Sequence, residues 1–262
     1  MRIRLFIIAA VALVLAYAGL VEPNWLKVRT YDLAVPGLAS EVTVVHIADI
    51  HTNKIGAREN KALDAIERIN PDYVLVAGDL LKGENALTEG LTFLSRLTAR
   101  RAIYVVPGNA DHTLIEAVES GEVPRSFGGW RILMNESVDC GSFTLVGIDD
   151  PVRCRDDVKM AFAGVTHTKP IFVLTHFLAR KHLDDMREHN VDMIFSGHTH
   201  GGQIGAGPLV SRIPYAHRSR YIAGLYRFNT GWLYVTRGVG TNLFPLRLLC
   251  RPEVTVFHLK GA

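Results

Sequence analysis

The sequence predicts an α/β protein built from layers of sheet and helix, preceded by a helix that spans a membrane. Short apolar runs rich in β-branched residues alternate with segments of helical spacing, which is the pattern of layered α/β folds. Most of these runs end in a polar turn that carries Asp, Asn or His. An uncharged apolar stretch from Leu5 to Val21 precedes them and is just long enough to cross a bilayer.

These patterns place the individual elements. Helices are predicted at 61–69 and 87–97, where apolar residues recur three and four positions apart. Asn70-Pro71 ends the first of them. Strands are predicted at 42–47, 73–76, 103–106, 143–148, 171–174, 193–195, 233–236 and 254–259.

The composition fits one globular domain and excludes several classes of protein. Of 262 residues, 48% are apolar, so a sizeable core can form. The formal net charge of +3 provides no basic footprint for a nucleic-acid partner. Cys140, Cys154 and Cys250 form no C-x-x-C pair, so we expect neither a disulfide framework nor a structural zinc site.

The N-terminal segment divides the chain into an anchor (1–22), a linker (23–40) and a globular domain (41–262). A cleaved signal peptide is an alternative to the anchor, because residues 16–18 form an A-x-A site. We expect a retained anchor, since the apolar run continues past this site to Val21.

The charges that flank the apolar run favour one orientation in the membrane. Arg2 and Arg4 precede the run, whereas Lys27 and Arg29 follow it at a distance, beyond Glu22. This bias favours a cytoplasmic N-terminus. The globular domain is therefore expected outside the cytoplasm, attached by a single N-terminal span.

Seven polar residues follow predicted strands. In open α/β sheets, ligand sites lie outside the carboxyl ends of the strands, so these side chains should converge. A lone His at a strand end is more often structural than a ligand, but polar residues at five strand ends predict a shared site. The seven residues are Asp49, His51, Asp79, Asn109, His176, His198 and His200.

The chemistry of this set predicts two metal ions. Carboxylates and imidazoles together suit Mn²⁺, Fe or Zn²⁺ rather than Ca²⁺ or Mg²⁺. Seven ligands are too many for one ion, but they fit two ions about 3.5–4 Å apart that share one carboxylate. Such a pair can grip phosphate oxygens, activate a water molecule and stabilise an in-line transition state.

The motifs that contain these residues resemble those of the calcineurin-like metallophosphoesterases. The order in that family is D-x-H, G-D, G-N-x-[DE], a lone His and G-H-x-H. The matching segments here are Asp49-Ile50-His51, Gly78-Asp79, Gly108-Asn109-Ala110-Asp111, His176 and Gly197-His198-Thr199-His200.

This resemblance implies a four-layer fold, with two packed β-sheets flanked by helices, and a role for each ligand. Asp79 would bridge the two metals. One metal would be held by Asp49, His51 and His200. The other would be held by Asn109, His176 and His198.

Other segments resemble a bacterial membrane-associated phosphodiesterase branch, some members of which are UDP-2,3-diacylglucosamine pyrophosphatases of lipid A synthesis. This narrower resemblance implies a location at the bacterial inner membrane. The segments are the N-terminal anchor, 147–151, 201–203, 237–240 and 245–247.

The chain departs from the family pattern after Asn109. Many relatives carry a His there that protonates the leaving group or contacts the phosphate, whereas this chain has Ala110. His112 is a candidate to replace it, beside Asp79 and Asn109 as catalytic residues; the alternative is a polar residue that begins the next helix. A phosphate leaving group needs less general-acid help than an alkoxide, so Ala110 favours anhydrides or activated diesters.

Two arginines and one segment are candidates for further contacts. Arg237 and Arg247 are expected to contact substrate phosphate, because a guanidinium matches phosphate geometry. The basic and aromatic segment 212–220 predicts contact with anionic headgroups or with a phosphorylated substrate, and a solvated loop is the alternative.

The sequence thus predicts a binuclear metal-dependent hydrolase of phosphodiester or phosphoanhydride bonds. Its substrate is expected to be associated with the membrane or linked to a nucleotide. A UDP-2,3-diacylglucosamine pyrophosphatase is one specific alternative. A non-catalytic metal-binding scaffold is the alternative outside enzymes, although such proteins usually lose ligands and all seven are present here.

Overall fold

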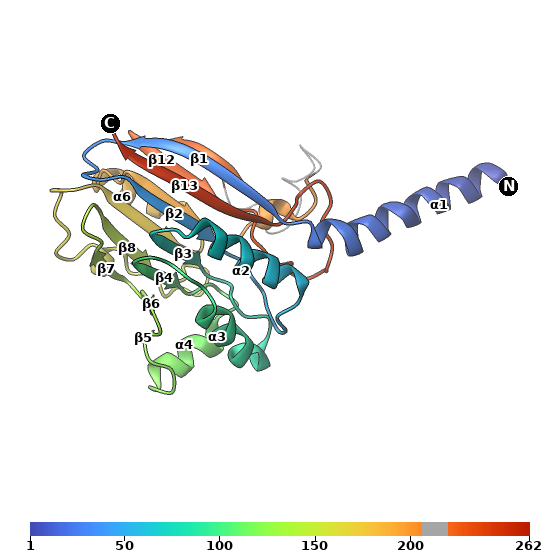
Figure 1. Ribbon diagram of the computed structural model, residues 1–262, viewed down its shortest axis with the longest axis horizontal. Helices are drawn as coiled ribbons and strands as arrows, with labels where there is room; N and C mark the ends of the chain where they lie inside the picture. The colour runs from blue at the N-terminus through green and yellow to red at the C-terminus, as the bar shows by residue number, and fades with distance from the viewer. Residues whose placement is uncertain (206–219) are drawn as a thin grey trace.

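The computed structural model describes residues 1–205 and 220–262, which form a layered body and one projecting helix (Figure 1). Two β-sheets pack face to face in the body, and helices cover the outer face of each. The described residues therefore have the four layers that the sequence analysis expected. Apart from Arg220, the basic segment 212–220 lies outside the described residues.

The first sheet is mixed, with a parallel centre. Its strands are β1 (Lys27–Val35), β2 (Val42–Ile47), β3 (Tyr73–Ala77), β4 (Ala102–Val106), β5 (Ser126–Phe127), β6 (Trp130–Ile132) and β13 (Glu253–Gly261). They lie in the order β1-β13-β2-β3-β4-β6-β5. Because β2, β3 and β4 are parallel neighbours, their carboxyl ends lie at the same edge of the sheet.

The second sheet has the same organisation. Its strands are β7 (Glu136–Asp139), β8 (Thr144–Ile148), β9 (Ile171–Thr175), β10 (Met193–Ser196), β11 (Gly224–Phe228) and β12 (Gly231–Val235). They lie in the order β11-β12-β10-β9-β8-β7. The four central strands are parallel, and the antiparallel strands β7 and β11 form the edges.

Helices form the two outer layers. On the first sheet these are α2 (Ala57–Ile69), α3 (Leu87–Ser95) and α4 (His112–Glu119). On the second sheet they are α5 (Val158–Ala161) and α6 (His182–Glu188). Short helical turns are η2 (Glu22–Asn24), η3 (Glu84–Ala86) and η4 (His200–Gly202).

The central strands are largely apolar because both of their faces are buried. In β3, Val74 and Val76 pack against the helices, whereas Tyr73, Leu75 and Ala77 face the second sheet. Successive side chains of a strand point to opposite faces, so a strand between two layers needs apolar residues at every position. This explains why the sequence shows these strands as continuous apolar runs.

Half of the segment 23–40, predicted as a linker, forms β1 and belongs to the first sheet. It pairs in parallel with β13 along its whole length, at the edge of the sheet. Within β1 only Leu33 and Val35 are buried. An edge strand with so few buried residues has no apolar run, which is why the sequence pattern does not reveal it.

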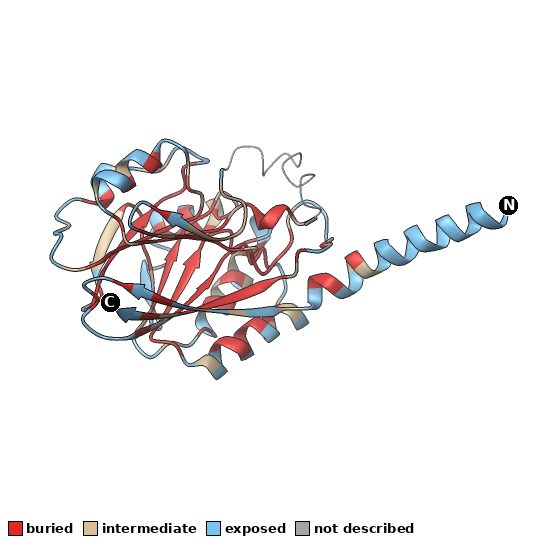
Figure 2. Cartoon of the chain, turned by 90° about the horizontal axis from the view of Figure 1, so that it is seen from above, coloured by how far each residue is buried: buried red, intermediate tan, exposed pale blue. Residues whose placement is uncertain are grey.

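The N-terminal helix α1 (Arg2–Ala16) projects from the body, and none of its residues is buried (Figure 2). It continues through the π-helical turn η1 (Tyr17–Val21), where Ala18 is buried against the body. By length and composition, residues 2–24 are one candidate membrane span, and a signal sequence meets the same criteria. The apolar side chains of α1 are thus exposed along its whole length.

The packing between the two sheets generates a stability prediction. Phe172 is fully buried there and stacks on Phe143 with ring centroids 4.3 Å apart. Phe172→Ala should lower the free energy of unfolding by about 3–5 kcal/mol, because the lost ring leaves a cavity. Urea unfolding of the detergent-solubilised full chain measures this. Phe127→Ala is the control, since Phe127 is 64% exposed, and an equal loss for both variants would contradict the prediction.

Candidate metal centre

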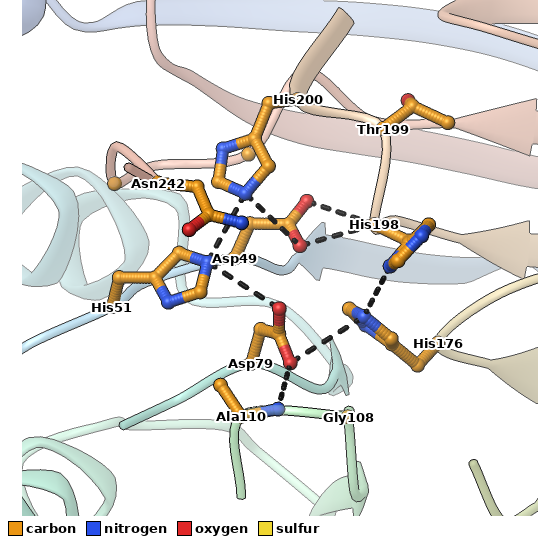
Figure 3. A network of polar contacts seen from close by, with 12 residues as sticks. Asp49, His51, Asp79, Gly108, Ala110, His176, His198, Thr199, His200 and Asn242 are labelled. Atoms are coloured by element: carbon orange, nitrogen blue, oxygen red, sulfur yellow. Dashed lines mark hydrogen bonds and ion pairs between the residues drawn. The ribbon is translucent and has the colours of Figure 1, made fainter. Parts of the chain in front are cut away.

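The seven predicted ligands come together where the carboxyl ends of five strands meet, and Figure 3 labels all of them except Asn109. Strands β2, β3 and β4 of the first sheet are followed by four of them. Strands β9 and β10 of the second sheet are followed by the other three. In chain order they are Asp49 and His51 after β2, Asp79 after β3, Asn109 after β4, His176 after β9, and His198 and His200 after β10.

Four of these residues form a first group. Asp49, His51, Asp79 and His200 each offer one ligand atom within 4.8 Å of those of the others, and all four are buried. The Nε2 atoms of His51 and His200 lie 3.1 Å apart. Nε2 of His51 is also 3.3 Å from Oδ2 of Asp79, and Nε2 of His200 is 3.7 Å from Oδ1 of Asp49. The lone pairs of these atoms therefore converge on one small volume.

A second group lies on the other side of Asp79. It consists of Asp79, His176 and His198, again with ligand atoms within 4.8 Å of one another. Nε2 of His176 is 3.1 Å from Nδ1 of His198, 3.2 Å from Oδ1 of Asn109 and 3.4 Å from Oδ1 of Asp79. Asp79 thus directs one oxygen to each group, and Figure 3 shows its carboxylate between the two sets of imidazoles.

The backbone of the site adopts an uncommon conformation. Five of the seven residues have φ values of 44–71°, in the left-handed region that residues with a Cβ rarely adopt. Such conformations cost about 1–3 kcal/mol each and cluster at functional sites. They turn the chain sharply at the strand ends, so that these side chains point inward. The five are Asp49, His51, Asp79, His198 and His200.

Two glycines of the motifs are required by close packing around Asp79. A Cβ on Gly78, whose φ is +74°, would lie 2.6 Å from the backbone nitrogen of Gly108. A Cβ on Gly108 would lie 2.9 Å from Nδ1 of His176 and would also overlap Oδ1 of Asp79. The absence of both side chains lets the loops after β3 and β4 meet, and the N–H of Ala110 then donates to Oδ1 of Asp79 at 2.7 Å.

Hydrogen bonds outside the cluster set the orientation of two imidazoles. Nδ1 of His51 lies 3.3 Å from the carbonyl oxygen of Leu81, and Nδ1 of His176 lies 2.8 Å from that of Ala77. A carbonyl only accepts, so each Nδ1 carries the proton and each Nε2 presents its lone pair to the cluster. This pattern of outer contacts is typical of metal-binding histidines.

Burial makes three of the imidazoles weak bases. It lowers the pKa of His198 to about 3, and it lowers the pKa of His51 and His200 as well. In His176 burial acts in the same direction, but the charges of Asp79 and Asp49 together raise its pKa above the ordinary value. Neutral imidazole is the form that binds a metal ion.

The two carboxylates respond differently to the same surroundings. Burial raises the pKa of Asp49 to about 7, and the charge of Asp79 acts in the same direction. For Asp79, burial also opposes ionisation, but the charges of His176 and His51 and the N–H of Ala110 bring its pKa below the ordinary value. The central carboxylate is therefore the one most strongly held as an anion.

This donor set fits a pair of divalent ions. Neutral imidazole nitrogens and an anionic carboxylate converge from two sides, and without a cation between them their lone pairs would repel one another. Nitrogen and oxygen donors together suit Mn, Fe or Zn. Asp49, His51 and His200 would hold one ion, Asn109, His176 and His198 the other, and Asp79 lies where a bridging ligand is needed.

Asp111 contributes to the site in a way that the sequence analysis did not assign. It is fully buried, and its two carboxylate oxygens accept from the N–H groups of Leu81 and Gly108, both at 2.9 Å. These bonds tie the loop after β4 to the loop after β3. The sequence could have indicated Asp111, because it is the acidic residue that ends the G-N-x-[DE] motif. Its role in the structure is to position the two loops.

Arg153 is a second residue that sequence reasoning missed. Its Nε donates to the carbonyl oxygen of Asn109 at 2.7 Å. The turn that carries it is held by buried Asp150, whose carboxylate accepts from the N–H groups of Val152 and Arg153 at 2.9 and 3.2 Å. The sequence could have indicated this turn, because Asp149-Asp150-Pro151 directly after a strand is typical of a turn held by an aspartate side chain.

The other three candidates lie outside the two groups. His112 begins α4, and its buried Nδ1 has no hydrogen-bond partner within the described part of the chain. Arg237 is half-buried, and its Nη1 donates to Glu253 at 3.1 Å. Arg247 is fully buried, and its guanidinium donates to the carbonyls of Arg237, Gly238, Gly240 and Cys250. A guanidinium occupied by main-chain carbonyls does not reach a substrate, so this geometry argues against the expected phosphate contact of Arg247.

The family was identified by comparison with known proteins. The family model described as calcineurin-like phosphoesterase matches residues 42–202, which include all seven residues of the cluster. The chain belongs to the calcineurin-like phosphoesterases. This confirms the family, the fold and the enzyme class that the motifs predicted, and the Asp/His cluster is a candidate site for divalent metal.

Three relatives are similar to most of the length of this chain. It is 31% identical over 257 residues to the phosphodiesterase YaeI of Escherichia coli strain K12, covering 93% of this chain and 92% of YaeI. It is 28% identical over 253 residues to a metallophosphoesterase of Helicobacter pylori strain J99, covering 93% of this chain and 65% of that protein. A Danio rerio transmembrane protein with a metallophosphoesterase domain is 27% identical over 277 residues, with 95% of this chain and 61% of that protein covered. The chain thus spans less than two thirds of the length of the latter two.

The tight packing at Gly108 generates a prediction about the phosphoesterase site. Gly108→Ala should displace Asp79 or His176, lowering the free energy of unfolding by about 1–3 kcal/mol and kcat/KM by about 100-fold. Hydrolysis of bis-p-nitrophenyl phosphate and urea unfolding of the full chain measure the two effects. Gly141→Ala is the control for activity and should leave kcat/KM unchanged, because an added Cβ at Gly141 meets open space; the positive φ of Gly141, which Gly108 does not share, affects only its stability. Unchanged activity of Gly108→Ala would show that the loops are not closely packed.

Proposed function

We propose that this chain hydrolyses phosphodiester or phosphoanhydride bonds at a pair of divalent metal ions, close to a membrane surface. The observation that carries the proposal is the position of Asp79, which directs one carboxylate oxygen to each of two imidazole groups. A shared carboxylate of this kind is what a two-metal centre requires. When bound, the ions supply Lewis-acid stabilisation of the phosphoryl oxygens and activation of water.

The residues of the chain then have distinct tasks. Asp79 fixes the separation of the two groups, and its own position is fixed by the N–H of Ala110. The backbone N–H of His198 donates to both oxygens of Asp49 at 3.0 Å, which holds the loop after β10 against the loop after β2. Because the cluster is assembled before substrate arrives, little reorganisation is needed during the reaction.

Arg153 provides the positive charge that the phosphate needs beside Asn109. Its Nε donates to the carbonyl oxygen of Asn109, whereas its two terminal nitrogens have no hydrogen-bond partner among the described residues. A guanidinium stabilises negative charge but does not donate its proton at neutral pH. It therefore suits a leaving group that is itself a phosphate. This supports the preference for anhydrides or activated diesters inferred from Ala110.

The proposed location rests on α1. Its exposed apolar surface and the Danio rerio relative, whose name describes a transmembrane protein, both support anchorage in a membrane. We further propose that the chain has three parts: an anchor at 1–22, a short connection, and a catalytic domain that includes β1. We also propose that the catalytic domain lies outside the cytoplasm. The substrate would then be a phosphate compound at the bilayer, and UDP-2,3-diacylglucosamine is the specific candidate.

The central role of Asp79 is tested by removing its charge. Asp79→Asn should lower the metal content of the purified full chain from about two ions and reduce kcat/KM by at least about 100-fold. Metal analysis and Mn²⁺-dependent hydrolysis of bis-p-nitrophenyl phosphate and UDP-2,3-diacylglucosamine, each repeated with chelator, measure this. Asp139→Asn is the control, because the Asp139 side chain is 70% exposed on β7.

The outcomes of that experiment separate the alternatives. A preference for UDP-2,3-diacylglucosamine would identify a lipid-precursor pyrophosphatase, and a preference for the simple diester would identify a general phosphodiesterase. Folded wild-type protein with no metal and no turnover would exclude catalysis and favour the non-catalytic scaffold.

Arg153 provides an independent test of the leaving-group argument. Arg153→Ala should lower kcat/KM on a pyrophosphate substrate by about 10- to 150-fold, the value of a charge-assisted hydrogen bond, with metal content unchanged. Arg153→Lys should keep part of the activity because it keeps the charge. Arg96→Ala is the control at an exposed arginine after α3. If Arg153→Ala loses activity only on alkyl esters, Arg153 does not serve a phosphate leaving group.

A further inference from the structure

A pocket at the base of α1 gathers four cationic side chains. It has a volume of about 270 Å³, and its cations are Lys27, Arg29, Arg237 and Arg251. They come from β1, from the turn after β12 and from the segment before β13, so the fold places them together although they are far apart in the sequence. None of them belongs to the metal centre.

The positive charge of the pocket is only partly neutralised. Nε of Arg29 and Nη1 of Arg237 both donate to buried Glu253, at 2.6 and 3.1 Å. Glu22 is the second carboxylate nearby; it lines the pocket, and its Oε1 accepts from the N–H of Cys250. Four cations against two carboxylates leave a formal excess of two positive charges. The ammonium group of Lys27 is exposed and has no polar partner among the described residues.

Exposed apolar side chains line this pocket or lie on the segments that adjoin it. Leu249 and Tyr17 line the pocket itself. The exposed fractions are 73% for Leu20, 73% for Leu249, 68% for Leu243, 66% for Phe244 and 51% for Trp25. The segment 243–249 lies beside the base of α1, where the N–H of Arg247 donates to the carbonyl of Ala18 at 2.9 Å (Figure 1). The rim is thus continuous with the apolar surface of α1.

We propose that this pocket binds the phosphate headgroup of an anionic phospholipid in the leaflet where α1 leaves the membrane. The inference rests on the proposed membrane anchorage. Excess positive charge attracts an anionic headgroup, by about 1 kcal/mol for each cation near a charged membrane surface. The apolar rim enters the acyl region, and Trp25, over which the guanidinium of Arg251 stacks at 4.0 Å, lies at the interface where tryptophan is enriched.

The bound headgroup would orient the metal centre toward the bilayer. Arg237 lies in the pocket, and Gly238, the next residue, packs against the side chain of Asp49. Gly240 donates its N–H to the carbonyl of Asp49. Because one short segment joins the pocket to a predicted metal ligand, a lipid held at Arg237 places the site close to the membrane surface.

The test uses the full chain, with α1, in dodecyl maltoside micelles. Native mass spectrometry counts bound lipid during titration with phosphatidylglycerol, phosphatidylcholine or inorganic phosphate. Wild-type chain should bind phosphatidylglycerol more tightly than either other probe. Lys27→Glu should weaken the binding of phosphatidylglycerol roughly 25-fold, which is about fivefold for each of the two units of charge changed. Lys27→Arg keeps the positive charge and should bind this lipid as tightly as wild type does. Lys159→Glu is the matched control at an exposed lysine of α5.

Each of the other outcomes overturns the proposal. Equal binding of the two lipids, or no effect of Lys27→Glu, removes the headgroup site. Inorganic phosphate bound as tightly as phosphatidylglycerol shows an anion site without a lipid. Extraction of cell membranes with alkaline carbonate distinguishes a failure of the anchorage: a released chain has no membrane span, whereas a retained chain without lipid preference lacks only the pocket. Hydrolysis of phosphatidylglycerol would make the pocket part of the substrate site.

Discussion

The negative charge of Asp79 is buried between imidazoles from both sheets, and the arrangement of the surrounding loops follows from the need to stabilise it. A buried carboxylate without partners costs several kcal/mol, so it persists only where other groups compensate. Here the N–H of Ala110 and the rings of His51 and His176 do so. Three features bring the loops close to this carboxylate. They are the left-handed turns, the two glycines Gly78 and Gly108, and the hydrogen bonds that Asp111 accepts from Leu81 and Gly108.

The ligand cluster could be predicted from the polar residues that follow the apolar strands, because the carboxyl ends of parallel neighbouring strands lie at the same edge of a sheet. Since β2, β3 and β4 run parallel, and β9 and β10 likewise, a polar residue after each must lie at the same edge. The sequence pattern failed where burial is one-sided or the strand is short. β1 and β11 are edge strands with mixed residues, and β5 has only two residues. Such strands depend on their neighbours and not on an apolar run of their own.

The arginines show a second limit of sequence reasoning. Arg237, Arg247 and Arg153 all occur in loops, and the sequence alone does not indicate which way a long side chain points. Arg247 turns inward and satisfies main-chain carbonyls of the segment 237–250, whereas Arg153 lies at the surface beside Asn109. Residue type predicted a cation near phosphate, but only the folded loops determine which cation is free to act.

The base of α1 is part of the folded body. Ala18 is buried and accepts from the N–H of Arg247, and Glu22 accepts from the N–H of Cys250. The sulfur of Cys250 in turn lies 3.2 Å from the carbonyl oxygen of His200. The border between the projecting helix and the folded body therefore lies near Tyr17. A soluble fragment designed for crystallisation should keep the chain from about this residue onward, because a cut after Val21 removes a helical turn against which the loop carrying Arg247 is folded.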